Sequence, residues 1–348
     1  MTSTESHQAN DGTKVKLSDI AKQTGYSLAT VSKALNGKGD ISETARQAID
    51  KALKESGYVR RVSPTRRQRT IEVVFKDFET IWALEVLRGI IREAKPHDIN
   101  VMVAESGDRQ HPDPSWIEGL IERQPIGAIL VFSNLTDKER GMFQSYNIPF
   151  VVFDPSGNPA LDDLSVQADN WMGGVIATRH LLELGHKRIG IITGPDEMLC
   201  SRARLDGYSA ALAERGIPSS PELIAEGDFT TPGGYEGAKA LLEDECNRPT
   251  AIFAGSDLQA MGVYETARQL KIRIPEDLSV IGFDDIQTAA YMGPALTTVR
   301  QPLQDMASTA ARMIIDTTEG RTIQKRVILS TSLVVRDSTQ RLARAKDQ

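Results

Sequence analysis

The sequence predicts a small all-helical domain at the N-terminus, followed by an α/β body built from two parallel-sheet lobes. Two short amphipathic segments divided by a glycine come first, and from residue 71 onward short β-branched runs alternate with helical stretches. Apolar strands joined by helices are typical of parallel sheets that helices cover on both faces. We expect a disordered tail over 1–15, the helical domain over 16–58, a basic hinge or linker over 59–70 and the two lobes over 71–340.

Length and composition narrow the function classes. The 348 residues are enough for two or three domains, and no apolar run reaches the ~18 residues that span a bilayer. The polar start lacks the apolar stretch of a secretory signal, so we expect a cytoplasmic protein with no membrane partner. Cys200 and Cys246 form no close pair for zinc, and we expect both to be buried free thiols. No metal or cofactor is predicted.

Charge is distributed unevenly along the chain. Residues 1–70 hold 13 Lys or Arg against 7 Asp or Glu, whereas the whole chain has a formal net charge of -6. The first segment is therefore basic and the remainder acidic. A basic head on an acidic body indicates a polyanion partner for the head, although a solvated basic tail is the alternative.

The basic segment contains a helix-turn-helix spacing. Leu17, Ile20 and Ala21 fall on one helical face, and the same spacing recurs after Gly25 at Val31, Ala34 and Leu35. Counted from Leu17, alanine is fifth, glycine ninth and valine fifteenth. The glycine permits a tight left-handed turn between two helices. Ser27 then caps the second helix, and a third helix follows from the cap Ser42 to Gly57.

The second helix of such a motif enters the major groove of DNA by its N-terminal end. That geometry nominates Leu28, Ala29, Thr30 and Lys33 for base edges: the two apolar residues for a thymine methyl, and the lysine for guanine or a phosphate. The residues that flank them are assigned to phosphates or to the motif's first turn. These flanking candidates are Leu17, Ser18, Ser27, Ser32 and Asn36. For each residue, a helix cap or a solvated surface position is the alternative.

Residues 17–59, LSDIAKQTGYSLATVSKALNGKGDISETARQAIDKALKESGYV, resemble the headpiece of the lactose/galactose repressor (LacI/GalR) family. The resemblance extends over nearly all of residues 16–336. It implies a transcription regulator, expected to be a repressor, with a periplasmic-binding-protein-like body whose chain crosses between lobes more than once. It also implies that Asn36 and Tyr58 contact the DNA backbone. We expect a homodimer that reads an inverted-repeat operator.

The linker departs from the family pattern. Five arginines occur in ten residues, and Arg61, Pro64 and Arg67 stand where the family's hinge helix has asparagine, alanine and leucine. The leucine wedge that the family places in the minor groove is therefore missing. We expect Arg60, Arg61 and Arg67 to bind DNA instead, because a narrow minor groove attracts arginine. A flexible basic tether is the alternative.

In the body, four apolar runs precede Asp154 and at least three follow Lys187, which predicts two similar lobes. The segment LTTVRQP, residues 296–302, is expected to cross between lobes, and residues 183–195 are expected to open the second lobe. Paired α/β lobes enclose a cleft at the carboxyl ends of their strands. A small polar effector, with a sugar as the favoured class, is expected in that cleft.

Residues at strand ends are the candidates for binding this effector. Arg204 and Asp284 match the family's main effector ligands by motif, since a guanidinium fork and a carboxylate both bind adjacent hydroxyls. Trp82 and Phe229 match positions whose rings pack on the effector, and Ser256 matches a polar family position. Asp257 follows Ser256 past the same strand in AGSD, and Asp154 and Trp171 are further lining candidates. A structural ion pair for the charged residues and core packing for the rings are the alternatives.

Two other functions are alternatives to regulation. A transport protein with the same body is opposed by the headpiece and the missing signal. An enzyme using Asp284 and Asp285 as acid and base is opposed by their adjacency, because neighbouring side chains on an extended chain point apart. His186 is expected to be structural, and no enzymatic motif occurs in the sequence.

Overall fold

The computed structural model describes residues 15–35, 41–56, 69–76, 81–107, 115–131 and 135–342. Five residues predicted to contact DNA lie outside these ranges. They are Asn36, Tyr58, Arg60, Arg61 and Arg67. The predictions for these residues, for most of the linker and for the tail up to residue 14 therefore remain predictions.

The headpiece consists of three helices around one small core. They are α1 (Leu17–Thr24), α2 (Leu28–Leu35) and α3 (Glu43–Glu55). Gly25 ends α1 in the left-handed conformation, with φ 73°, and its N–H donates to Ala21 O over 3.0 Å. Ser42 accepts a hydrogen bond from Ala45 N and caps α3. The predicted turn, both caps and the helical spacing are confirmed, because all of them depend on local chain geometry. The core residues are Ile20, Val31, Ala34, Ile49 and Ala52.

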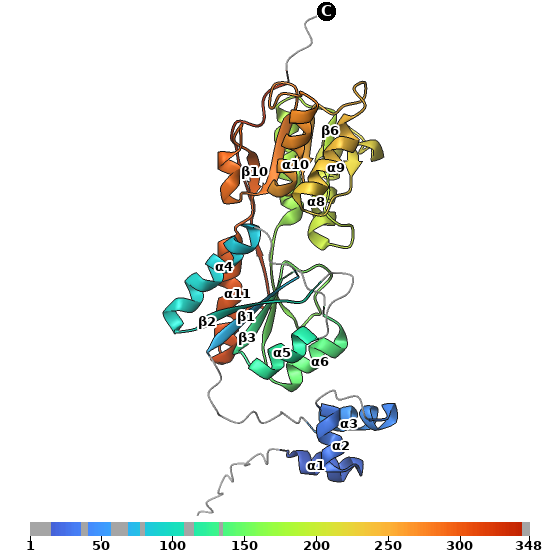
Figure 1. Cartoon of the computed structure of the whole chain (residues 1–348), viewed down its shortest axis with the longest axis vertical. Helices are drawn as coiled ribbons and strands as arrows, with labels where there is room; N and C mark the ends of the chain where they lie inside the picture. Colours follow the sequence, from blue (N-terminus) through green and yellow to red (C-terminus); the bar gives the residue numbers. More distant parts are fainter. Residues whose placement is uncertain are drawn as a thin grey trace, which may run out of the picture. The chain divides into compact units, whose positions relative to one another are not determined.

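The first lobe of the body holds a six-stranded parallel sheet in the order β11-β5-β4-β3-β1-β2 (Figure 1). Its strands are β1 (Thr70–Phe75), β2 (Asn100–Glu105), β3 (Gly127–Val131), β4 (Phe150–Phe153), β5 (Leu164–Ala168) and β11 (Arg326–Leu329). Three helices follow its strands in sequence: α4 (Ile81–Ala94), α5 (Ser115–Arg123) and α6 (Asp137–Ser145). A fourth helix, α11 (Leu303–Thr318), comes much later in the chain and packs against α4.

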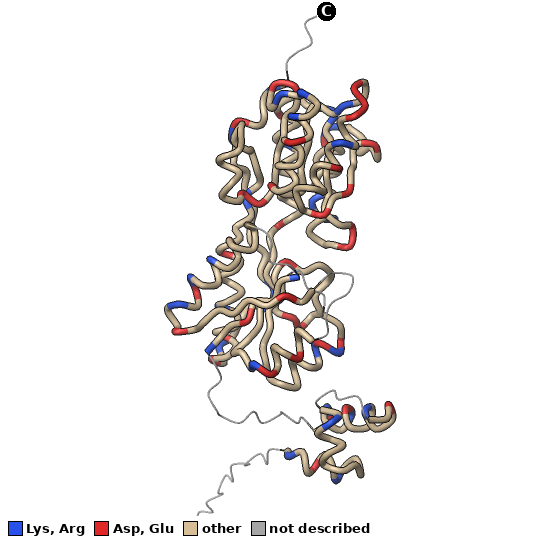
Figure 2. The backbone as a smooth tube through the Cα atoms, viewed as in Figure 1, with Lys and Arg blue, Asp and Glu red and all other residues tan. Residues whose placement is uncertain are grey.

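The second lobe holds another six-stranded sheet, in the order β12-β10-β9-β8-β6-β7, parallel except for the β10–β12 pair. Its strands are β6 (Ile189–Ile192), β7 (Ile224–Ala225), β8 (Ala251–Ala254), β9 (Ser279–Asp284), β10 (Thr297–Arg300) and β12 (Ser332–Val334). Its helices are α7 (Asn170–Glu183), α8 (Leu199–Glu214), α9 (Thr231–Leu242) and α10 (Asp257–Gln269). Acidic and basic residues both occur on each lobe (Figure 2).

Strand alternation explains how each sheet is covered. In the second lobe, Ile281 and Phe283 of β9 face one side of the sheet and pack with α7 and α8. Val280 of the same strand faces the other side and packs with α9 and α10. In the first lobe, Val166 and Ala168 of β5 point toward the cluster that contains α4 and α11. Because successive strand residues face opposite ways, the intervening residues of β5 face the other side of that sheet.

The chain crosses between lobes three times: after β5, after β10 and after β11. The predicted crossing at 296–302 is confirmed, because β10 lies in the second sheet and the following α11 packs in the first lobe. The predicted opening of the second lobe at 183 is wrong, since α7 already packs against α8 and the second sheet. An amphipathic pattern shows that a helix covers a sheet, but it does not show which sheet.

The two cysteines differ in environment. Cys200 is buried as predicted, but Cys246 is exposed, so that part of the prediction is wrong. Cys246 lies in the turn between α9 and β8, where its N–H donates to Asp244 Oδ1 over 3.1 Å. A turn residue lies at the surface whatever its own polarity.

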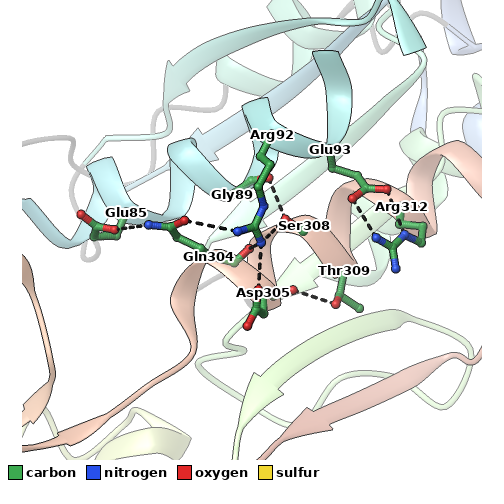
Figure 3. Close-up of polar contacts among 9 residues, drawn as sticks. All are labelled: Glu85, Gly89, Arg92, Glu93, Gln304, Asp305, Ser308, Thr309 and Arg312. Carbon is green, nitrogen blue, oxygen red and sulfur yellow. Dashed lines mark hydrogen bonds and ion pairs between the residues drawn. The ribbon is translucent and has the colours of Figure 1, made fainter. Parts of the chain in front are cut away.

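Helices α4 and α11 pack closely, which fixes the returning chain on the first lobe (Figure 3). Gly89 allows the approach, because a Cβ there would overlap the carbonyl oxygen of Gln304. Ser308 Oγ donates to Gly89 O over 2.9 Å, and Arg92 donates to Asp305 over 2.8 Å. These contacts connect the helix that begins beside Trp82 to the segment that follows the β10 crossing.

We expect Gly89→Ala to lower the free energy of unfolding by about 1–3 kcal/mol, because the added methyl forces α4 and α11 apart. Gly141→Ala in α6 is the matched control, since no atom lies within 4 Å of its Cβ position. Helix propensity should make the control neutral or stabilising by up to about 1 kcal/mol. Urea unfolding followed by circular dichroism measures both. Equal effects of the two substitutions would contradict the close-approach argument.

Candidate functional site

An open-sided cavity of about 760 Å³ lies between the two lobes of the body. All five residues predicted to bind an effector line it: Trp82, Arg204, Phe229, Ser256 and Asp284. Trp82 comes from the start of α4 in the first lobe, and the other four come from the second lobe. Other lining residues are Phe75, Lys76, Val131, Asp154, Cys200, Asp228, Thr230 and Leu258. The cavity therefore joins strand ends of both sheets, as parallel α/β lobes predict.

Arg204, on α8, is buried and held in one plane. Its Nε donates to Asn170 Oδ1 over 2.9 Å and its Nη1 donates to Gly255 O over 2.5 Å. Its Cζ lies 3.7 Å from the centroid of the Phe283 ring and 5.3 Å from that of Phe229. Two hydrogen bonds and two aromatic faces thus fix the guanidinium before any ligand arrives.

Two buried carboxyl groups lie near this guanidinium. Burial raises the pKa of Asp284 to about 7; the charge of Arg204 opposes the shift and that of Asp154 adds to it. Burial likewise raises the pKa of Asp154, against the charge of Arg204. Weak hydrogen bonds of 3.5 Å from Gln301 and Asn170 reach its carboxylate oxygens. One guanidinium thus lies near two buried carboxyl groups, and this shortage of positive charge favours a protonated form of the pair.

A third buried carboxyl group, that of Asp257, supports the turn that carries Asp284. Asp257 Oδ2 accepts from Ile286 N over 2.9 Å and Oδ1 accepts from Thr298 over 2.6 Å. Burial, with the charge of Asp284 second, raises its pKa well above the usual range. The turn is strained, with φ 113° at Asp284 and 58° at Asp285. Asp257 therefore ties this turn to α10 and to β10.

The same turn separates the two adjacent aspartates. Asp284 lines the cavity, whereas Asp285 pairs with Arg300 and Arg336 at 2.7 and 2.6 Å. The two carboxylates therefore point in different directions, as expected for neighbouring residues of an extended chain.

Ser256 and Phe229 are positioned by each other. Ser256 Oγ accepts from Gln259 N, which caps α10, and donates to Phe229 O over 3.1 Å. Phe229 has φ 68°, and its ring fills the space where a Cβ on Gly194 would be. The hydroxyl of Ser256 is thus engaged with backbone, and the ring of Phe229 is held over the cavity.

The two tryptophans proposed for the cleft lie in different places. Trp82 is largely buried and makes an edge contact with Phe153, with ring centroids 6.0 Å apart. Trp171 is 44 % exposed and does not line this cavity, so its prediction as a lining residue is wrong. It follows Asn170 in the first turn of α7, and Asn170 is hydrogen-bonded to Arg204 and Asp154, which line the cavity.

Of the predicted DNA-reading residues, Leu28, Ala29 and Thr30 lie at the N-terminal end of α2, and Lys33 lies in its last turn. Leu28 is 53 % exposed, and Ala29 and Lys33 are exposed as well. Ser27 Oγ accepts from Thr30 N over 3.1 Å, so the predicted cap is present. Leu17, Thr30 and Ser32 are half-buried and Ser18 is exposed. An exposed leucine at this place suits apolar contact with a base, and its contact with DNA stays a prediction.

Comparisons with known proteins decide the family. Residues 16–61 match the model "Bacterial regulatory proteins, lacI family", and residues 178–339 match "Periplasmic binding protein-like domain". The HTH-type transcriptional repressor CytR of Escherichia coli (strain K12) is 33% identical over 335 residues, which cover 95% of this chain and 98% of the relative. The chain belongs to the LacI family of bacterial regulatory proteins. It is a DNA-binding transcriptional regulator and not an enzyme.

Solved structures support the same fold for this LacI-family regulator. A transcriptional regulator CelR–cellobiose complex is 31% identical, covers 93% of this chain and 100% of its own, and has a TM-score of 0.73. A LacI family regulator from Enterococcus faecium with bound ribose is 26% identical, covers 79% of this chain and 100% of its own, and has a TM-score of 0.72.

Other polar residues of the regulator have structural roles. His186 Nδ1 lies 2.9 Å from Thr250 Oγ1, and its Nε2 lies 3.0 Å from Gln340 O, so this histidine joins the C-terminal segment to the second lobe. Among the described residues there is no metal-binding cluster of three or more His, Cys, Asp or Glu. Within the same residues, no helix is long and apolar enough to cross a membrane.

Sequence reasoning missed two informative residues of the cavity. Asp228 directly precedes Phe229, and its Oδ1 accepts from the N–H and the hydroxyl of Thr230 at 2.9 and 2.7 Å. Its place after β7 was the available signal, since strand ends supply cleft residues. Burial raises the pKa of Cys200 to about 12, which leaves a neutral thiol in the cavity wall. No sequence pattern places Cys200 there.

The raised pKa of Asp284 has a measurable consequence. Because the folded protein favours the protonated form, the ligand-free protein should lose stability as pH rises from about 4 to about 7. Asp284→Asn should remove part of this loss, roughly 1.4 kcal/mol for each pKa unit involved. Asp154 and Asp257 should leave a residual slope. Urea unfolding at pH 5 and pH 8 measures it. The same difference between variant and wild type at both pH values would contradict this reading of the site.

Proposed function

We propose that this regulator is a homodimeric repressor that binds an inverted-repeat operator in the cytoplasm. A small neutral effector rich in hydroxyl groups, of the sugar class, occupies the cavity between its lobes and changes its affinity for the operator. The observation that carries this proposal is a preorganised guanidinium, Arg204, beside two carboxyl groups and two aromatic rings in one cavity.

The chemistry of the cavity suits a polyol. Arg204 Nη2 makes no hydrogen bond to another residue in the described part of the chain, and it can donate to a ligand hydroxyl. Asp284 and Asp154 can accept from hydroxyl groups, which replaces part of the solvation they lost on burial. Trp82 and Phe229 supply apolar faces for ring C–H groups. The cellobiose and ribose in the two solved relatives support the sugar class.

An effector in this cavity would act on the arrangement of the lobes. Trp82 and Asp154 belong to the first lobe, and Arg204, Phe229 and Asp284 to the second. A ligand that contacts both sets stabilises the lobe arrangement in which all of its contacts form. The three chain crossings are the segments that must accommodate such a change.

A second copy of the chain is expected on the α4 side of the first lobe. A single helix-turn-helix contacts too little DNA for high affinity alone. Leu84 and Ile91, seven residues apart on α4, are 46% and 48% exposed, and Val103 on the edge strand β2 is 39% exposed. Residues seven apart share one helix face. This apolar face, Leu84, Ile91 and Val103, supports the dimer proposal.

The effector proposal is tested by substitution of Asp284. A thermal-shift screen of sugars first identifies a ligand that raises Tm, since binding to the folded form stabilises it. We expect Asp284→Ala to weaken that ligand about ten- to a hundredfold, because each charged hydrogen bond contributes roughly 1.5–3 kcal/mol. Operator affinity should stay within a few-fold. Asp206→Ala, at an exposed position of α8, is the control. Unchanged sugar affinity in Asp284→Ala would refute the assignment.

The dimer proposal is tested on the apolar face of α4. We expect the double substitution Leu84→Glu with Ile91→Glu to give a monomer at micromolar concentration, because charges on a buried face must be desolvated. Its affinity for an inverted repeat, selected from random DNA, should fall to that for one half-site. Leu161→Glu, at a residue 85% exposed, should have neither effect. Sedimentation and fluorescence anisotropy measure both properties. A wild-type monomer that binds one half-site as tightly as two would end the proposal.

A further inference from the structure

One face of the first-lobe sheet is polar where β5 and β11 meet. On β5, Val166 and Ala168 pack in the core, so Ser165 and Gln167 face the opposite side, and Asp169 continues the same alternation. The strand register pairs Ser165 with Arg326 and Gln167 with Ile328. Side chains of paired residues share one face of a sheet. Five side chains from neighbouring strands therefore lie on one surface.

This surface forms the floor of a second cavity, of about 1010 Å³ with its open side included. All five residues line it, together with Trp171. Asp154 and Cys200 line both this cavity and the effector cavity, so the two lie back to back across a shared wall. The second cavity is separate in its other walls, because Arg204, Phe229 and Asp284 do not line it.

The polar groups of this floor have unused hydrogen-bonding capacity. Ser165 is buried and Gln167 half-buried, yet neither side chain has a hydrogen-bond partner among the described residues. Asp169 Oδ1 accepts from Met172 N over 3.0 Å, which leaves Oδ2 available. Ser165, Gln167 and Asp169 follow one another at roughly 7 Å along the strand direction, about the width of one sugar ring.

The rim of the cavity is apolar and exposed. Trp171 is 44% exposed and Ile328 is 61% exposed, although large apolar side chains of a parallel sheet and its helices are usually covered. The proposed dimer leaves them uncovered, because β11 and β2 are at opposite edges of the sheet. An indole face beside amide, hydroxyl and carboxylate groups is suited to a ring with both C–H and O–H surfaces.

We propose that this cavity is a second ligand site, distinct from the effector cavity, which binds a neutral saccharide. Gln167 and Asp169 bind its hydroxyl groups, and Trp171 and Ile328 cover its apolar face. A neutral ligand is favoured because Asp169 and Arg326 offset each other's charge. The guanidinium of Arg326 already donates to Pro159 O and Ala160 O at 3.0 and 3.2 Å, so it serves to hold the cavity wall.

The site has a direct route to the effector cavity. Asn170 lines the second cavity, and its Oδ1 accepts the hydrogen bond from Arg204 Nε over 2.9 Å. The chain crossing after β5, at Asp169 and Asn170, lines the same cavity. A saccharide bound there would therefore contact one segment that joins the lobes and the residue that orients Arg204.

The experiment uses the fluorescence of Trp171 in the full-length chain. The protein has three tryptophans, so Trp82→Phe with Trp116→Phe leaves Trp171 as the sole emitter. Asp284→Ala is added to disable the effector cavity. This protein is titrated with D-glucose, D-ribose and cellobiose to tens of millimolar. We expect a saturable blue shift with at least one of the three sugars, because a bound ring removes water from the indole.

Two further variants assign the signal to the cavity. Gln167→Leu, which keeps the size of the side chain and removes its hydrogen bonds, should weaken binding at least tenfold. Ile328→Ala, at an exposed position, should weaken it severalfold without risk to the fold. Gln144→Leu on an exposed part of α6 should change nothing. A response that does not saturate with any of the sugars, or that survives Gln167→Leu and Ile328→Ala, overturns the proposal. A shift that follows protein concentration alone also overturns it, since the face would then bind another copy.

Discussion

The arrangement of the cleft depends on the burial of one guanidinium among more carboxyl groups than it can neutralise. Arg204 reaches Asn170 at the first chain crossing and Gly255 at the end of β8, so its two hydrogen bonds join segments 34 and 51 residues away in sequence. Its charge offsets the burial of Asp154 and Asp284 only in part. Arg204 therefore holds distant segments together, while the carboxyl groups beside it lack full charge compensation. A polar ligand can supply the hydrogen bonds that these groups lack.

The support for this arrangement comes from contacts with the backbone behind the lining side chains. Asp257 holds the strained turn of Asp284, and Ser256 holds the backbone of Phe229 while it caps α10. Gly194 provides the space for the ring of Phe229. Substitution of any one of these residues would leave the lining residues unchanged but would shift their side chains. These contacts therefore fix the geometry of the side chains that line the cavity.

Sequence reasoning succeeded where the controlling physics is local. The spacing around Gly25 and the caps Ser27 and Ser42 follow from backbone geometry within a few residues. Arg204 and Asp284 were identified by motif resemblance, and strand ends explained why they meet. The errors concern orientation in three dimensions. The surroundings of Trp171 and Cys246, and the sheet that α7 covers, depend on packing between distant segments. The strand-end position of Asp257 was apparent from the sequence, but its support of the turn at Asp284 was not, because that role depends on packing between distant segments.

The three crossings also determine the order in which the chain can become functional during synthesis. The headpiece core draws on residues 15–53, so all of its parts leave the ribosome early. The first-lobe core includes Met306, Ala310 and Ile314 of α11, and both sheets need β11 or β12 for their last strand. Neither lobe can close before the final tenth of the chain is made. A nascent chain therefore carries the core of its DNA-binding headpiece well before it has the cavity that we propose for the effector.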